Sequence, residues 1–164
     1  AVRRVLGPLW SFLIQWIIDN LNNLHTMQKR AAIFRRETFS AAHRLYNPEW
    51  SDEKNFEVFG KCSRKNYHGH NYTIIVKLVG VIDKDTGFVY DASALGRLIK
   101  SEILDRFDHM NLNLDCPEFK NLNPTAENMC LVFHDILRPK IPEHLDIFVT
   151  VCETEKNSAQ YPVE

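Results

Sequence analysis

Alternation of apolar and polar residues along the chain predicts four β-strands. Residues 32–43 mix aromatic and polar side chains with a period near two, and residues 71–82 give the strongest strand signal because they are rich in β-branched residues. The segment at 83–87, DKDTG, is typical of a turn, and FVYD at 88–91 is expected to return as the second strand of a hairpin. Residues 144–154 alternate again and predict the last long strand.

Apolar residues spaced three and four positions apart predict two helices between these strands. The first covers 95–107 and is capped by Asp91 or Ser93; the second follows Thr125 as its N-cap and is ended by prolines. With a short final strand near Tyr161, the order is β-β-β-α-α-β. This order predicts an α+β fold in which two helices cover one face of an antiparallel four-stranded sheet.

The first 26 residues do not fit this pattern. Two arginines precede an apolar run from Leu9 to Ile18, which is shorter than the ~20 residues that a membrane-spanning helix needs. A secretory signal and a transit peptide share some of these features. We favour a third interpretation, in which residues 1–26 are a leader or an added segment outside the fold and 27–164 form the domain.

Composition limits the classes of function. The chain has 164 residues, 45% of them hydrophobic and 25% charged, which is typical of one soluble globular domain. With 20 basic and 21 acidic residues it has no excess of positive charge, so we do not expect nucleic acid as a partner. Four cysteines lie far apart without a CxxC pair, which argues against a zinc ribbon or a disulfide framework and favours a reducing, cytoplasmic compartment.

Three histidines have the spacing of a metal site. His68 and His70 are two residues apart, so on a strand their side chains leave the same face, and Gly69 between them leaves room for close approach. His43 ends the first strand, where an antiparallel partner would bring it alongside. Three imidazoles with an open fourth position suit catalytic zinc. For the HGH pair alone, a chance spacing with solvent-facing rings is the favoured interpretation.

Cys62 lies six residues before His68 and has basic neighbours, Lys61, Arg64 and Lys65. A metal ion within a few residues and this positive charge should together lower the pKa of the thiol, so we expect Cys62 to exist partly as thiolate. The sulfur could be a fourth metal ligand, which would make the site structural, or a base held away from the metal.

Two further candidates come from carboxylates. Asp108 and His109 form an adjacent acid–imidazole pair directly after the first predicted helix, and such a pair can move protons. Glu153 follows the last long strand, where a solvated strand end is the alternative interpretation.

Six motifs in order carry a family resemblance: FSAAHRL, SDEKNFEVFGKC, HGHNY, DHMNLNLD, PTAEN and ETEKN. Over residues 33–161 the chain resembles the 6-pyruvoyl-tetrahydropterin synthases. The resemblance implies the tunnelling fold, in which three subunits close their sheets into a barrel and two rings stack as a homohexamer with active sites between subunits. It also implies conversion of 7,8-dihydroneopterin triphosphate to 6-pyruvoyl-tetrahydropterin in tetrahydrobiopterin biosynthesis, a lyase reaction that releases triphosphate.

The resemblance also assigns roles to residues. The residues it implies are zinc ligands His43, His68 and His70; general base Cys62; proton-transfer partners Asp108 and His109, the latter pair from a neighbouring subunit; pterin anchor Glu153; and pocket-lining Thr125 and Glu127. It adds magnesium as a candidate requirement for activity. The cations available for the triphosphate are Arg36, Arg44, Lys61, Arg64 and Lys65.

Two departures and two alternatives accompany this resemblance. SRKNY stands between Cys62 and HGH where the family often has an Asn-rich loop with glycine, and Pro162 stands where relatives continue with a basic residue. The related 6-carboxy-tetrahydropterin synthases place the cysteine about four residues before HGH, so the gap of six from Cys62 to His68 favours the pyruvoyl enzyme. A non-catalytic zinc scaffold with Cys62 as a ligand is the second alternative.

Overall fold

The computed structural model describes residues 12–17 and 29–163. Residues 12–17 form a short helix with exposed apolar side chains. The predicted domain boundary at Met27 and the rest of the predicted leader lie outside the described residues. Among the helices of the described segments, none has the length and apolarity needed to cross a bilayer.

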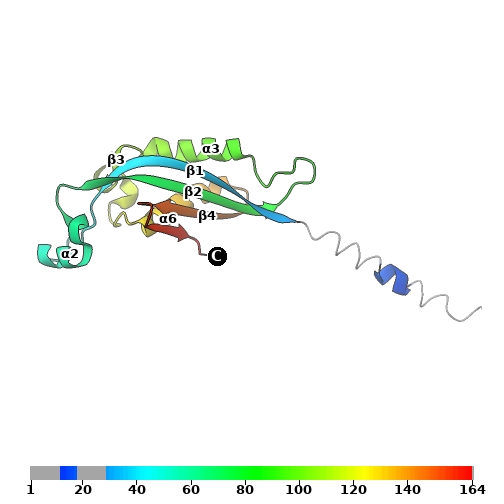
Figure 1. Ribbon diagram of the computed structural model, residues 1–164, viewed down its shortest axis with the longest axis horizontal. Coiled ribbons are helices and arrows are strands. Elements are labelled where there is room, and N and C mark those ends of the chain that lie inside the picture. The colour runs from blue at the N-terminus through cyan, green and yellow to red at the C-terminus, as the bar shows by residue number, and fades with distance from the viewer. Residues whose placement is uncertain (1–11, 18–28, 164) are drawn as a thin grey trace, which may run out of the picture.

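One sheet runs through the domain (Figure 1). Its strands are β1 (Arg30–His43), β2 (His68–Val81), β3 (Met110–Asn111), β4 (Asp146–Cys152) and β5 (Ser158–Tyr161). They lie in the order β3-β1-β2-β4-β5, and all pairs are antiparallel except β3 with β1. The long strands and the short final strand confirm the sequence pattern, whereas the predicted count of four is wrong. The sheet has five strands and is not closed into a barrel within the chain.

The predicted strand at 88–91 does not form. β2 is paired with β1 on one edge and with β4 on the other, so no edge of β2 is free to receive a hairpin partner. Asp83 closes a tight turn instead, since its N–H donates to the Phe88 carbonyl at 2.8 Å and its carboxylate accepts from the N–H of Thr86 at 2.8 Å. Asp91 then caps the next helix by accepting from the Ser93 N–H.

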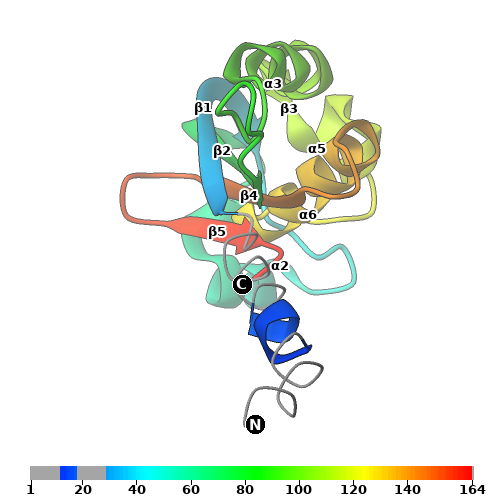
Figure 2. The same ribbon diagram turned by 90° about the vertical axis from the view of Figure 1, so that its right-hand side faces the viewer.

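The helices lie mainly on one face of the sheet (Figure 2). A helical run comprises α3 (Ala92–Ile99), a π-helical turn (Lys100–Leu104) and α4 (Asp105–Phe107); α5 (Leu112–Asp115) and α6 (Ala126–Leu137) follow. Thr125 caps α6 by accepting from the Asn128 N–H, as the sequence predicts. Two main helical segments on one face therefore confirm the α+β prediction.

The core lies between these helices and the inner sheet face. Inward positions alternate along the strands, and the buried sheet residues are Phe39, Ala41, Tyr72, Ile74, Val76, Leu78, Ile147, Val149 and Val151. The helices supply Leu95, Ile99, Ile103, Phe107, Met129, Phe133 and Leu137. Continuing the same alternation to the ends of β1 and β2 places His43, His68 and His70 on the inner face, because side chains two residues apart share a side.

Helix α2 (Asp52–Phe59) closes the end of the sheet that carries these histidines, and the sequence analysis did not predict it. Its only buried residue is Asn55. The Asn55 carboxamide accepts from the Asn47 N–H at 2.7 Å and donates to the carbonyls of Asn47 at 2.9 Å and Ser51 at 3.0 Å. One buried side chain thus joins α2 to the loop that follows β1.

Replacing Asn55 with alanine should destabilise the protein by about 2–3 kcal/mol, because a buried side chain and its hydrogen bonds to the backbone of Asn47 and Ser51 would be lost. Thermal unfolding of N55A should shift down by about 5–10 °C. The exposed Asn121 provides the control, and N121A should unfold within about 1 °C of the parent protein. Equal midpoints for N55A and N121A would refute the structural role of Asn55.

Candidate metal centre and active site

His43, His68 and His70 meet at one end of the inner sheet face. The β1–β2 register pairs His43 with His68 and Ala41 with His70, which brings the three rings together across two strands. One ligand nitrogen from each lies within 4.8 Å of the others, and the Nε2 atoms of His43 and His68 are 3.0 Å apart. The predicted convergence of three imidazoles is therefore confirmed.

The protonation of these rings suits a metal ion. His43 is fully buried and its Nδ1–H donates to the Pro124 carbonyl at 2.9 Å, which leaves Nε2 with its lone pair directed at the group. Burial lowers the pKa of both His43 and His68, so both rings are neutral near pH 7. His70 Nε2 is buried and has no hydrogen-bond partner. An unpaired buried nitrogen facing two neutral imidazoles is the arrangement that a divalent cation would satisfy.

Glu153 adds a carboxylate to the same site. It directly follows β4, and its Oε1 lies 3.4 Å from His43 Nε2 and 3.6 Å from His70 Nε2. The Glu153 side chain is about one-fifth exposed, so it borders both the histidine group and solvent. The carboxylate is therefore next to the candidate metal position and open to an incoming molecule.

Cys62 lies nearby but outside the histidine group. It sits in a 3₁₀ turn (Gly60–Ser63), and its carbonyl accepts from the Leu45 N–H at 2.9 Å. Arg44 fixes the same turn by donating from Nε to the Ser63 carbonyl at 2.6 Å. Because the group of ligand atoms within 4.8 Å comprises only the three histidines in the described segments, Cys62 is not arranged as a fourth ligand.

The basic neighbours of Cys62 do not by themselves lower the pKa of its thiol, so that part of the prediction is wrong. Burial and then the negative charge of Glu153 raise the pKa of this thiol. The side chains of Lys61, Arg64 and Lys65 are exposed, where water screens their charge.

Asp108 and His109 lie on the other edge of β1 from the strand that carries His68 and His70. Asp108 Oδ1 accepts from the Ser40 N–H at 2.8 Å, and this hydrogen bond lowers the pKa of Asp108. His109 Nδ1 is 3.0 Å from the same oxygen, and the His109 N–H donates to the Ser40 carbonyl at 2.6 Å. The pair is thus built as predicted, but within the described residues its hydrogen bonds go to Ser40 and not to the histidine group.

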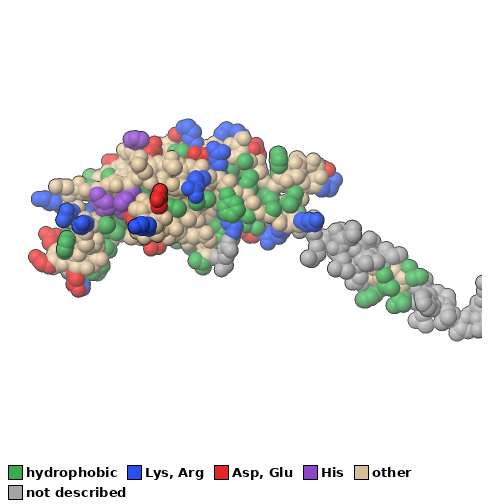
Figure 3. Space-filling model, viewed as in Figure 1, with side chains coloured by type: hydrophobic (Ala, Val, Ile, Leu, Met, Phe, Trp, Pro, Cys, Tyr) green, Lys and Arg blue, Asp and Glu red, His purple; other side chains and the backbone are tan. Residues whose placement is uncertain are grey.

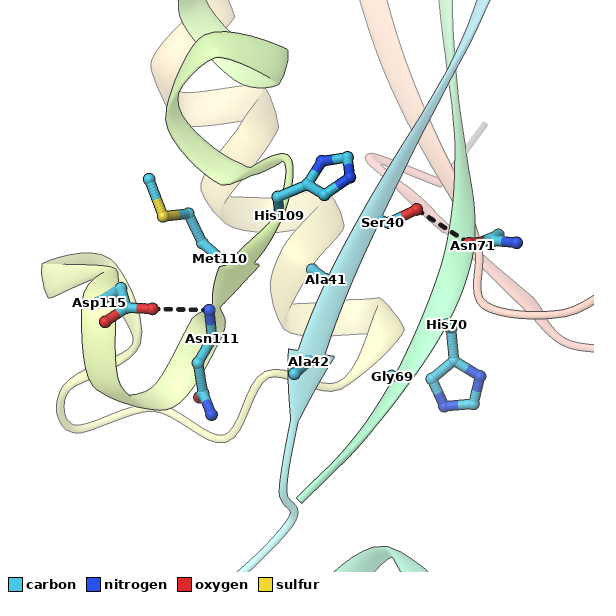
Figure 4. A pocket seen from close by; sticks show the side chains of 10 residues that line it. All are labelled: Ser40, Ala41, Ala42, Gly69, His70, Asn71, His109, Met110, Asn111 and Asp115. Carbon is cyan, nitrogen blue, oxygen red and sulfur yellow. Dashed lines mark hydrogen bonds between the residues drawn. The ribbon is translucent and has the colours of Figure 1, made fainter. Parts of the chain in front are cut away.

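A hollow of about 590 Å³ surrounds this edge. Figure 4 shows its lining, with His109 and Met110 beside β1 on one side and His70 projecting from β2 on the other. The side chain of His109 is 81% exposed. It therefore faces solvent rather than Cys62 of its own chain.

Two non-glycine residues in the described segments have left-handed backbones, and both adjoin candidate site residues. Tyr67, directly before His68, has φ 59°, and His109 itself has φ 60°. Such conformations cost energy and are found disproportionately at functional sites. They are consistent with backbone geometry that is fixed for function at both places.

Thr125 and Glu127 have a less direct relation to the histidines. The Thr125 hydroxyl is used as the cap of α6, while Pro124 before it holds His43. Glu127 is exposed in the first turn of α6. Figure 3 shows histidine side chains reaching the surface at the α2 end of the sheet, with Lys and Arg side chains beside them.

The sequence analysis missed two residues of this site. Pro124 acts through its carbonyl, which carries no side-chain signal. Tyr72 extends the alternation of His68 and His70 by one more position and lies in the core with its ring centroid 5.5 Å from that of His70. The two-residue spacing of positions 68, 70 and 72 could have indicated that Tyr72 lies on the same face of the strand as His68 and His70.

Comparisons with known proteins agree with this geometry. The family described as 6-pyruvoyl tetrahydropterin synthase matches residues 32–164. The 6-pyruvoyl tetrahydrobiopterin synthase of Drosophila melanogaster is 41% identical over 137 residues, covering 83% of this chain and 82% of that protein. The human enzyme of the same name is 39% identical over 135 residues, covering 82% and 93%. The solved structure of Caenorhabditis elegans 6-pyruvoyl tetrahydropterin synthase superposes with a TM-score of 0.77 at 40% identity, covering 84% and 98%.

Proposed function

This chain belongs to the 6-pyruvoyl tetrahydropterin synthase family, and from that premise we propose that it converts 7,8-dihydroneopterin triphosphate to 6-pyruvoyl-tetrahydropterin with release of triphosphate. It is an enzyme of tetrahydrobiopterin synthesis. The observation that carries the assignment of the site is the Glu153 carboxylate, 3.4 Å from Nε2 of His43 in a group of three converging imidazoles, with a thiol nearby that is not part of the group.

Glu153 anchors the pterin ring in this proposal. A pterin presents adjacent ring N–H and amino donors, and a carboxylate that accepts both forms a charge-assisted pair that fixes orientation. Because Glu153 also adjoins His43 and His70, the side chain of the bound pterin would lie over the histidine group. Thr125 and Glu127 contribute to the wall of this pocket through the segment that holds His43.

His43, His68 and His70 hold zinc in this proposal, because three neutral imidazoles with an open position are typical of catalytic zinc sites. A divalent ion there supplies Lewis acidity toward the hydroxyl groups of the substrate side chain. The Pro124 carbonyl keeps His43 in the tautomer that binds metal. Magnesium remains a candidate requirement for the triphosphate.

Cys62 is the base that accepts the proton from carbon. Its position outside the histidine group favours this role over the scaffold alternative, in which the sulfur would be a ligand. Its raised pKa means that the free protein holds the proton on sulfur near neutral pH. A metal cation held by the histidine group would favour the thiolate form of Cys62.

Asp108 and His109 complete the site from a neighbouring subunit in a homohexamer. Within the described chain, residues 30–39 of β1 pair only with β2, so most of the outer edge of β1 is open for another chain. The His109 side chain is exposed and so accessible to another chain, which supports a role in the adjacent site. The cations available to bind the triphosphate at the rim of the site are Lys61, Arg64 and Lys65. We also propose a cytoplasmic location.

A mixing experiment tests the shared site. C62A and H109A should each be nearly inactive, and refolding them together at equal concentrations should restore about a quarter of parental activity, because random assembly gives that share of sites both wild-type residues. Each variant refolded alone is the control. No recovery on mixing, with assembly intact, would place both residues in one subunit.

The proposed reaction is tested by product analysis. Purified protein supplied with zinc, magnesium and 7,8-dihydroneopterin triphosphate should form 6-pyruvoyl-tetrahydropterin and one triphosphate per turnover. Formation of the carboxy-pterin alone would assign the chain to the 6-carboxy-tetrahydropterin synthases instead.

A further inference from the structure

The hydroxyl of Tyr72 is a buried polar group without a partner. Tyr72 is 0% exposed, and its oxygen makes no hydrogen bond to any described residue. A phenol in a protein core usually finds an acceptor, since an unpaired buried hydroxyl is unfavourable. The Tyr72 hydroxyl is therefore available to donate a hydrogen bond.

The ring of Tyr72 is held rigidly beneath the histidine group. It stacks on Phe39 with centroids 5.1 Å apart and an interplanar angle of 16°. It makes edge-to-face contacts with two histidine rings, with its centroid 5.5 Å from that of His70 and 6.0 Å from that of His43. Because the ring is fully buried, stacks on Phe39 and contacts two of the histidine rings, its position beside the candidate metal centre is constrained.

The register of the sheet places a carboxylate acceptor, that of Glu153, beside Tyr72. Thr73 pairs with Cys152, so Tyr72 and Glu153 occupy the next position of the β2–β4 register and share the inner face. The phenol offers a hydrogen-bond donor and the carboxylate offers only acceptors, so the two groups are chemically complementary.

The Glu153 carboxylate has two competing uses. At 3.4 and 3.6 Å from the nitrogens of His43 and His70, it could become a fourth ligand of a metal held there. A fourth protein ligand would close the site and also take the carboxylate away from the pterin. Something must therefore hold Glu153 off the metal.

We propose that Tyr72 is a positioning residue whose hydroxyl donates to the Glu153 carboxylate in the metal-loaded enzyme and keeps it free to bind the pterin. This inference rests on the proposed function of Glu153 as the pterin anchor. Tyr72 does not touch the substrate, because it is fully buried. Its effect on the reaction passes through Glu153.

Cobalt(II) spectroscopy of Tyr72→Phe tests the inference without turnover. In the cobalt-loaded, pterin-free protein, Y72F should shift and intensify the visible absorption as Glu153 joins the metal, while the double variant Y72F/E153Q should return to the parental spectrum. Tyr46→Phe is the matched control, because its hydroxyl bonds Asp52 at the surface, and Y46F should leave the spectrum unchanged. A parental spectrum for Y72F, or a shift that persists in Y72F/E153Q, would overturn the proposal.

Binding and stability give the second readout. Y72F should weaken neopterin binding and raise the KM on the order of tenfold, with a smaller change in kcat, and should not lower the thermal midpoint of the metal-free protein, because only an unpaired hydroxyl is lost. In the E153Q background the same substitution should change binding less than about twofold. Additive effects, or unfolding of Y72F several degrees lower, would show a merely structural role. Because the spectra require no turnover, an inactive wild-type protein would refute the proposed reaction and leave this test standing.

Discussion

His70→Ala should abolish metal binding and reduce turnover of the metal-loaded enzyme by more than about 10³-fold. His70 Nε2 is buried and without a partner, so the removal of its ring eliminates one of three nitrogens without breaking a hydrogen bond of that atom. Two imidazoles and a carboxylate remain. The affinity for a divalent ion should fall steeply, because each of the few ligands supplies a large share of the binding free energy. Metal analysis after gel filtration should find one zinc per chain in the parental protein and almost none in H70A.

His144→Ala is the matched control for H70A, since His144 is exposed and lies just before β4, at the end of that strand opposite to Glu153. H144A should keep full metal content and activity. Chelation of the parental protein should mimic H70A, and zinc should restore activity to the chelated parent but not to H70A. Full metal content and normal turnover in H70A would remove the histidine group from the mechanism.

The fold was predictable where local pattern and tertiary partner agree. β2 alternates strictly because one of its faces is buried along its length, so its strand signal is strong. The segment 88–91 also has apolar residues and was predicted as a strand. It could pair only if β2 had a free edge, and the pairing of β4 with β2 shows that it has none. Helix α2 buries no apolar side chain, because its only buried residue is Asn55, and hydrogen bonds from Asn55 hold it to the loop that precedes it.

The site was predictable where residues share one strand or one hairpin. His68 and His70 are related by strand period, and His43 needs only the antiparallel β1–β2 pairing to join them. The electrostatics of Cys62 were not predictable, because adjacency in sequence does not tell which side chains point to solvent. The side chains of Lys61, Arg64 and Lys65 point to solvent. Burial and the charge of Glu153 therefore raise the pKa of Cys62, whereas the sequence predicted a lowered pKa.

Cys62→Ala should reduce turnover by about 10³-fold while metal content and assembly are unchanged. The sulfur is the candidate base, and its loss removes the proton acceptor without removing a ligand, because the ligand group consists of the three histidines. The effect should fall on kcat with little change in KM, since Glu153 and not Cys62 is the proposed pterin anchor. Cys152→Ala is the matched control, because Cys152 is the other partly exposed cysteine of the described chain.

Alkylation kinetics separate a free base from a metal ligand at Cys62. In the metal-free protein the raised pKa keeps the thiol protonated near pH 7, so iodoacetamide should react slowly with Cys62. Loading zinc should accelerate the reaction, since a nearby positive charge favours the thiolate. If the sulfur were a ligand, zinc would protect it instead, and C62A would lose zinc. That pair of results would turn the catalytic assignment into the structural one.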